Sequence, residues 1–241
     1  MITFKGLLKY YREGFYYLSK LMETMDFGKA SELTFWKNLL KDKDENWAQF
    51  MIKEEAEVGL NEIQRTFNKS GTDVKVLELG PGPRSRLTEG WDRDMFTLMA
   101  VDPLADYYKN EFKGKPFLWQ GNAEDIKRMF PHNYFDMVFA SNSIDHSTSP
   151  EKIIEGVSEV LRVGGVLIVC GNEKEGTRAK WVGMHKHNLW IEGGKLMWET
   201  QKTQPKPILP DKYVPIQVRS LNYNLEGDAI QWFSGVWKKT S

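Results

Sequence analysis

Residues 76–87 read VLELGPGPRSRL, an apolar run that ends in a turn rich in glycine and proline. The run predicts a buried strand that carries Glu78 near its C-terminal end. Gly80 and Gly82 lack Cβ atoms, so the chain can turn tightly and a ligand can approach the backbone. The proline after each glycine removes an N–H group that a pyrophosphate would need, and serine replaces the third glycine of a dinucleotide fingerprint. The turn indicates a ligand without phosphate, although a plain strand-to-helix turn would use the same glycines.

Short apolar segments and helical patterns alternate after this point. The expected strands cover residues 74–80, 97–103, 115–122, 134–143 and 164–172, and the expected helices cover residues 104–112, 124–130 and 149–162. Strands that alternate with helices predict βαβ units and a parallel sheet. Right-handed crossovers then place the strand C-termini at one sheet edge, where ligands bind in such folds.

The flanking segments have different patterns. Residues 1–70 are predicted to be helical, because apolar side chains recur at steps of three and four. Their many aromatic residues would pack a lid onto the sheet or line an acceptor pocket (Tyr10, Tyr11, Phe15, Tyr16, Tyr17, Phe35 and Trp36). Residues 71–241 would form the main domain, with an acceptor-side insertion at residues 176–212. That insertion contains a hairpin signal, Glu-Gly-Gly-Lys at residues 192–195, and two final strands follow it.

The composition of the 241 residues narrows the possible environments. Lys plus Arg equals Asp plus Glu at 33 each, so no net charge favours a nucleic-acid partner. Cys170 is the single cysteine and cannot form an internal disulfide, which is typical of a reducing compartment. No apolar run approaches the roughly 20 residues of a membrane span. We therefore expect a cytoplasmic protein without a membrane span, and no feature indicates its oligomeric state.

A second acid follows the next expected strand. Asp102 ends the segment AVD, 24 residues after Glu78. A carboxylate at this position accepts hydrogen bonds from the hydroxyls of a ribose. It can also cap the helix that starts after it, and both roles are compatible.

Four blocks carry a family resemblance: VLELGPGP, VDP, GNAEDIKRMFPHNYFDMVFASNSIDH and VLRVGGVLIV. In this order and spacing, the chain resembles the class I S-adenosylmethionine-dependent methyltransferases, in particular the broad type 11 group, over residues 74–171. The resemblance implies a Rossmann-like, doubly wound, mostly parallel seven-stranded sheet with an antiparallel edge strand. It also implies S-adenosylmethionine as cofactor and S-adenosylhomocysteine as product.

The resemblance assigns cofactor contacts to several residues. Glu78 and the backbone of Gly80 and Gly82 would hold the amino-acid end, while Asp102 and the adjacent Pro103 would lie at the ribose. The adenine would meet Asn122, Ala123 and Glu124, and the methionine and sulfonium would meet Ser141 and Asn142. The sequence departs from the family pattern in two places: the family often has aspartate at Asn122, and Pro83 occupies the third position of the glycine motif.

The acceptor side contains three of the four histidines. His146 follows the fourth expected strand, and His185 and His187 follow the fifth. His146, with Asp145 beside it, is a candidate base for a hydroxyl acceptor; a structural histidine or a helix cap is the alternative. His185 or His187 would contact the acceptor. These four residues also form a conceivable metal set, but their spacing matches no familiar one, so no metal is predicted.

The sequence therefore predicts methyl transfer to a small-molecule or glycan acceptor, with oxygen as the expected atom. A non-catalytic adenosine-binding or interaction module on the same fold is the alternative from another class. An NAD-dependent oxidoreductase is less consistent, because the third glycine and a Tyr-x-x-x-Lys pair after the fourth strand are missing. A nucleic-acid acceptor is not expected, since SNSIDH at residues 141–146 differs from an Asn-Pro-Pro-Tyr motif and the charge is balanced.

Overall fold

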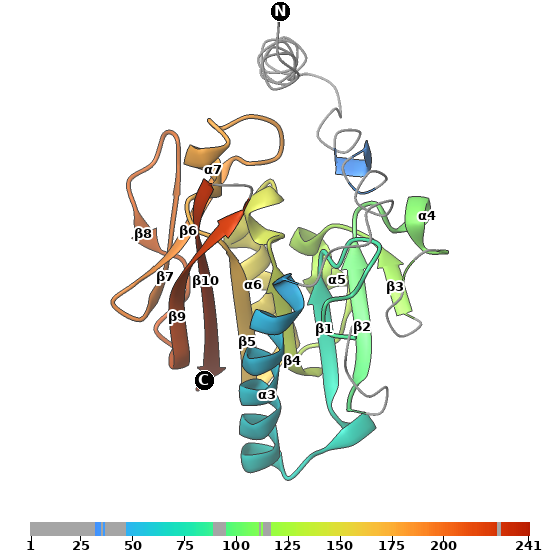
Figure 1. The fold of residues 1–241 in the computed structure, drawn as a ribbon. Coiled ribbons are helices and arrows are strands. Elements are labelled where there is room, and N and C mark those ends of the chain that lie inside the picture. The colour runs from blue at the N-terminus through green and yellow to red at the C-terminus, as the bar shows by residue number, and fades with distance from the viewer. Residues whose placement is uncertain are drawn as a thin grey trace, which may run out of the picture.

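The computed structural model describes residues 32–34, 36, 47–88, 95–110, 112, 117–225 and 228–241. The expectations for residues 1–31, including most of the lid aromatics, lie outside this part of the chain. The described residues form a large sheet with helices on both faces and a smaller sheet beside it (Figure 1).

The large sheet has the strand order β3-β2-β1-β4-β5-β10-β9. Its strands are β1 (Lys75–Leu79), β2 (Thr97–Asp102), β3 (Phe117–Gln120), β4 (Phe135–Ser141), β5 (Leu161–Asn172), β9 (Tyr213–Leu225) and β10 (Asp228–Lys239). The first five strands pair in parallel, and β10 pairs antiparallel with both β5 and β9. The predicted Rossmann-like sheet is confirmed. The antiparallel strand, however, is one place inside the edge, because β9 follows a crossover and then pairs with β10 as a hairpin.

One face of the sheet is covered by α3 (Trp47–Phe67) (Figure 1, blue). Ala56 and Ile63 of α3 are buried against side chains of β4 and β5. Gly59 allows this close approach, because a Cβ there would lie 3.0 Å from the Ile168 side chain. Residues 47–67 therefore pack on a face of the sheet, and the lid predicted for residues 1–70 stays a prediction. The amphipathic pattern predicted the helix, but it could not show that the apolar stripe faces the sheet.

The helices between the strands are short except for one. They are η1 (Gly71–Asp73), α4 (Ala105–Tyr108), η2 (Ala123–Asp125), α5 (Ile126–Met129), η3 (Ile144–His146) and α6 (Pro150–Val160). Ser149 caps α6 by accepting a hydrogen bond from the Lys152 N–H, and Pro150 occupies the first turn. The apolar residues of α5 and α6 pack with the opposite side chains of β1, β4 and β5. Successive side chains of β1, β4 and β5 alternate between the two faces, and both sides of these central strands are buried, whereas the edge strand β3 is largely exposed.

The insertion forms the smaller sheet. After α7 (Glu175–Arg178), β6 (His187–Glu192) and β7 (Lys195–Thr200) pair antiparallel, and β8 (Lys206–Pro207) joins β7. The expected hairpin at residues 192–195 is confirmed. Gly193 and Gly194 have positive φ values of 57° and 79°, as its tight turn requires. Buried Leu189, Leu196 and Trp198 join the core beneath the large sheet.

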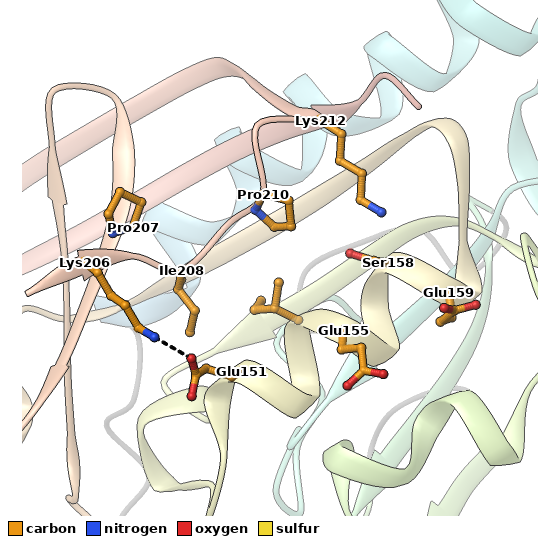
Figure 2. Close-up of a pocket in the computed structure, with 10 residues that line it drawn as sticks. Glu151, Glu155, Ser158, Glu159, Lys206, Pro207, Ile208, Pro210 and Lys212 are labelled. Atoms are coloured by element: carbon orange, nitrogen blue, oxygen red, sulfur yellow. Dashed lines mark hydrogen bonds and ion pairs between the residues drawn. The ribbon is translucent and has the colours of Figure 1, made fainter. Parts of the chain in front are cut away.

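A groove of about 330 Å³ separates α6 from the segment after β8. Figure 2 shows its two walls, joined by an ion pair of 2.7 Å between Lys206 Nζ and Glu151 Oε1. None of the individually predicted site residues lines this groove, although one wall belongs to the predicted acceptor-side insertion at residues 176–212.

Among the described helices, none is both long enough and apolar enough to cross a membrane.

Candidate active site

A second cavity, of about 150 Å³, opens at the C-terminal ends of β1, β2 and β4. Ten of the residues predicted from the sequence line it: Glu78, Gly80, Asp102, Pro103, Asn122, Ala123, Glu124, Ser141, Asn142 and His146. Gly82, Asp145, His185 and His187 do not line it. The cavity lies at the sheet edge where parallel α/β folds bind ligands.

The glycines of the first turn are required by their neighbours. Gly80 has a φ of +63°, and a Cβ there would lie 2.6 Å from the Ser143 Cβ. Gly82 has a φ of +64°, and a Cβ there would lie 2.6 Å from the Trp36 ring. Ser143 is fixed by donating a hydrogen bond of 2.9 Å to the Leu79 carbonyl. The turn therefore brings two cavity-lining side chains, Ser143 and Trp36, close to the backbone.

Gly80→Ala is expected to lower the free energy of unfolding by about 2–4 kcal/mol, because positive φ and a backbone-adjacent clash both oppose alanine. Gly193→Ala is the matched control. Gly193 also has a positive φ, but a Cβ there meets nothing within 4 Å, so its cost should be about 1 kcal/mol. Denaturant unfolding of both variants measures the difference. Equal losses would show that Ser143 does not restrict Gly80.

Glu78 stabilises the turn that follows β1. Its carboxylate accepts a hydrogen bond of 2.5 Å from Ser85 Oγ and one from the backbone N–H of Arg86. The side chain is buried, and burial raises the pKa of Glu78 to about 7. Glu78 lines the cavity and also orders residues 85–86, and its contact with the amino-acid end of the cofactor stays a prediction.

The raised pKa of Glu78 predicts a pH dependence of stability. The unfolded carboxyl loses its proton near 4.5, whereas the folded one keeps it to about 7. Stability is therefore fully present below pH 4.5 and is lost as the pH rises through about 7, by about 3 kcal/mol in total. In Glu78→Gln, which cannot ionise, this part of the pH dependence should be missing. Unfolding titrations across this range would measure it, and parallel profiles of the two proteins would contradict the shift.

Arg86 is a site residue that sequence reasoning missed. It lines the cavity, and its Nη1 atom is buried without a hydrogen-bond partner among the described residues. An unpaired guanidinium donor matches a carboxylate, because such pairs form charge-assisted hydrogen bonds. Arg86 is part of the stretch VLELGPGPRSRL, but the sequence of a turn does not show whether an arginine in it is buried or exposed to solvent.

Asp102 is nearly buried at the end of β2. Its Oδ2 accepts a hydrogen bond of 3.1 Å from the Gly82 N–H, and its Oδ1 accepts one of 2.8 Å from the Leu104 N–H. Burial raises the pKa of Asp102. The carboxylate thus orders the turn before α4 but does not cap the helix itself, because the N-cap residue of α4 is Leu104. Asp102 keeps lone pairs that ribose hydroxyls could use, and the predicted ribose contact stays a prediction.

The segment after β3 lies at another part of the cavity wall. Asn122 is exposed, and Ala123 is partly buried. Glu124 Oε1 accepts two hydrogen bonds of 2.8 Å from Thr148, one from its N–H and one from its hydroxyl. Glu124 therefore positions the loop before α6, and Ser147 and Thr148 of that loop also line the cavity.

The end of β4 supplies a free hydroxyl and a strained turn. Ser141 is buried, and its Oγ has no hydrogen-bond partner within the described residues. Asn142 has a positive φ of 48°, which asparagine tolerates better than most residues. Its Oδ1 accepts a hydrogen bond of 3.2 Å from the Asn172 N–H of β5.

Three predicted acceptor-side residues meet beside the cavity and form what we call the Asp-His-His cluster: Asp145, His146 and His185. Asp145 Oδ2 lies 3.3 Å from His146 Nε2 and 3.7 Å from His185 Nδ1. The two imidazole rings are edge to face with centroids 4.5 Å apart. Burial raises the pKa of Asp145, but both histidines lower it more, so the pKa stays below its ordinary value. Because His146 lines the cavity, the cluster reaches the ligand space.

His187 has a different environment from the one predicted. Its Nδ1 accepts a hydrogen bond of 3.1 Å from Trp198 Nε1, and its Nε2 lies 3.0 Å from the Ser147 carbonyl. This pattern requires a neutral ring with the proton on Nε2. Burial also lowers the pKa of His187. Since both nitrogens are engaged and the ring lies outside the cavity lining, the expected catalytic role of His187 is not supported by its position.

Comparison with known proteins identifies the fold's family. Residues 77–169 match a family model described as a methyltransferase domain. This match supports the predicted resemblance to the class I S-adenosylmethionine-dependent methyltransferases over this part of the chain. The predicted resemblance is thereby confirmed.

Individual relatives are distant. The chain is 24% identical over 163 residues to a tRNA U34 carboxymethyltransferase from Helicobacter acinonychis, a match that covers 67% of this chain and 53% of that protein. The chain thus spans about half the length of the curated relative. A candidate sarcosine dimethylglycine methyltransferase from Galdieria sulphuraria has 11% identity and a TM-score of 0.50, with 80% and 85% of the chains covered. A chain from the complex of the Haloferax volcanii Trm112 methyltransferase activator with a candidate methyltransferase has 10% identity and a TM-score of 0.50, with 78% and 93% covered. The two structures support the fold alone.

The cavity fits the cofactor of this family, S-adenosylmethionine. Its wall contains two buried polar atoms without partners in the described structure, Arg86 Nη1 and Ser141 Oγ. Arg86 would take the carboxylate of the methionine moiety, and Ser141 would donate or accept beside it. Asp102 would accept from the ribose hydroxyls. This donor set suits a ligand with a carboxylate and a ribose and contains no run of N–H groups for phosphates.

Proposed function

We propose that the protein transfers a methyl group from S-adenosylmethionine to an oxygen atom of a small-molecule or glycan acceptor in the cytoplasm. The observation that carries the proposal is the Asp-His-His cluster beside the cavity. The cluster joins Asp145 and His146, which follow β4, with His185 of the insertion at residues 176–212. Polar groups that can remove a proton therefore lie next to the cofactor cavity, as transfer to a hydroxyl requires.

The insertion supports an acceptor on this side. His185 and Met184 come from the loop before β6, and Met184 lines the cavity. The connection between β5 and β9 thus contributes side chains to the cavity mouth and to the cluster. Residues 176–212 are therefore proposed as the acceptor-side segment.

The bound cofactor supplies an electrophilic methyl group, which leaves the sulfonium with the bonding electron pair staying on sulfur. The chain's residues must align the acceptor, exclude water and receive the hydroxyl proton. His146 is the member of the cluster that faces the cavity. Asp145 holds one edge of the His146 ring at 3.3 Å, and its charge would stabilise a proton that reaches this group.

Transfer to tRNA is a second candidate, favoured by one finding. The curated relative from Helicobacter acinonychis is described as a tRNA U34 carboxymethyltransferase. The balanced charge of the chain argued against nucleic acid, but this relative leaves that exclusion without support. A tRNA acceptor would need a basic surface along the cavity, whereas four acidic residues and one arginine line it: Glu32, Glu78, Asp102, Glu124 and Arg86.

The proposal is tested by incubating the purified chain with S-adenosylmethionine carrying a labelled methyl group. Separate reactions would contain hydroxylated small molecules, oligosaccharides, and total tRNA. Label in the first two classes, stable to conditions that cleave esters, supports an ether oxygen as the methylated atom. Label in tRNA would replace the proposed acceptor with the second candidate. A chain that binds the cofactor but labels none of the three classes would favour the non-catalytic adenosine-binding module.

A further inference from the structure

The Asp-His-His cluster contains three buried polar atoms that point at one another and make no hydrogen bond. Asp145 Oδ2, His146 Nε2 and His185 Nδ1 make no hydrogen bond within normal limits in the described part of the chain, and only ion-pair contacts of 3.3 Å and 3.7 Å join Asp145 to the two rings. Asp145 is 5% exposed, so water cannot freely solvate its carboxylate. A buried polar atom without a partner costs about 1–3 kcal/mol, and more when it is charged. Three such atoms at one point therefore indicate a missing ligand.

The spacing of these atoms matches a metal ion. They lie within 4.8 Å of one another, with separations of 3.3 Å and 3.7 Å from Asp145 Oδ2. Ligand atoms at about 2.0–2.1 Å from a tetrahedral ion are roughly 3.3 Å apart. The same separations are long for hydrogen bonds. The distances in the cluster therefore fit a bound ion better than a direct hydrogen bond between the side chains.

Two further carboxylates surround the cluster in the way that metal sites require. Glu32 Oε2 lies 3.7 Å from His146 Nδ1, on the ring edge away from Asp145. Glu175 Oε1 lies 3.8 Å from His185 Nδ1, and Arg178 holds the Glu175 carboxylate. Histidine ligands usually direct their second nitrogen to a carboxylate, which fixes the ring and raises its basicity. Glu32 is placed for this role at His146, whereas Glu175 faces the same His185 nitrogen that would bind the ion and is therefore a candidate fourth ligand.

We propose that Asp145 Oδ2, His146 Nε2 and His185 Nδ1 bind one divalent transition-metal ion at the mouth of the cofactor cavity. Two imidazoles and one carboxylate favour ions of intermediate softness such as Zn²⁺, Fe²⁺, Mn²⁺ or Co²⁺. The sequence predicted no metal because residues 145, 146 and 185 match no familiar spacing. The insertion brings His185 to the other two residues, which the spacing alone cannot show.

The site deepens the proposed function, and only its role in catalysis rests on that function. Three protein ligands leave a coordination position open. His146 lines the cavity, so this position would be open to an oxygen of the acceptor. A bound ion would lower the pKa of a coordinated acceptor hydroxyl, so that the hydroxyl could release its proton to water although His146 would then be a ligand and not the base.

The test measures metal binding directly, without turnover. The tag-free, metal-depleted full-length chain would be titrated with Zn²⁺ by calorimetry and with Co²⁺ by visible absorption. One ion per chain is expected. Asp145→Asn and His185→Gln should each weaken Zn²⁺ binding by more than roughly 10-fold, since each loses a direct ligand. His132→Gln is the matched control, because His132 is exposed and pairs with Glu159; it should bind as the wild type does.

Unfolding free energies of all variants would confirm that each one is folded. A folded wild type that binds neither ion would overturn the inference, and so would unchanged binding in both cluster variants, which would place the ion elsewhere. Titration of the same metal-depleted chain with S-adenosylmethionine separates this inference from the proposed function. Cofactor binding without metal binding removes the metal site alone.

Discussion

His146→Gln should lower the rate of methyl transfer by about 10²–10⁴-fold, the usual contribution of a positioned acid–base group. His146 is the member of the Asp-His-His cluster that lines the cavity. Glutamine keeps a polar side chain of similar reach but can neither accept the acceptor's proton nor replace the imidazole as a metal ligand. Cofactor affinity should stay nearly unchanged, because the cofactor contacts are assigned to other residues.

Single-turnover kinetics with labelled cofactor would separate the two effects. His132→Gln again serves as control, since its ring is 71% exposed and lies outside the cavity lining. It should keep the wild-type rate. Full activity of His146→Gln would remove His146 from the reaction. Lost cofactor binding in this variant would instead assign it to the cofactor site.

Arg86→Met should weaken S-adenosylmethionine binding by about 100-fold, because each hydrogen bond between charged groups contributes about 1.5–3 kcal/mol. The buried Nη1 atom has no hydrogen-bond partner in the described structure. Binding a carboxylate there therefore breaks no existing hydrogen bond of this atom. Methionine has a similar length and keeps the apolar contacts of the side chain. Calorimetric titration measures the affinity of both proteins.

Arg84→Met is the control for the loss of a charge in the same turn. Arg84 lies two residues earlier and does not line the cavity, so cofactor binding should change little. A ligand that lacks the carboxylate, such as adenosine, should bind wild type and Arg86→Met equally. If Arg86→Met bound S-adenosylmethionine as tightly as the wild type does, the carboxylate would have another partner.

Most of the sheet could be predicted because its central strands are buried on both faces. The strands β1, β2, β4 and β5 therefore read as apolar runs with a turn after each, and these runs alternate with helical patterns, whereas β3 at the edge is largely exposed. The position of α3 could not be predicted. Its apolar stripe shows that one side is buried, but the same stripe is expected whether the helix forms a lid or packs on a face of the sheet. The position of β10 between β5 and β9 depends on which strand pairs with the free side of β5. The local sequence does not show which of the two final strands does so.

The site was predictable where it follows the strand ends. Glu78, Asp102 and Ser141 are placed by β1, β2 and β4, so their meeting at one edge follows from topology. Arg86 was missed because its burial depends on how the turn folds. His185 and His187 are equivalent in the sequence, yet Trp198 of the facing strand engages His187, while His185 reaches Asp145. Such differences arise from contacts between distant segments.

The central claim is that the cavity holds S-adenosylmethionine. Parallel calorimetric titrations of the purified chain with S-adenosylmethionine, S-adenosylhomocysteine and NAD test it most directly. Dissociation constants of roughly micromolar size, about −8 kcal/mol of binding free energy, are expected for the first two, and no binding is expected for NAD. Binding of NAD, or a folded chain that binds neither S-adenosyl compound, would contradict the account.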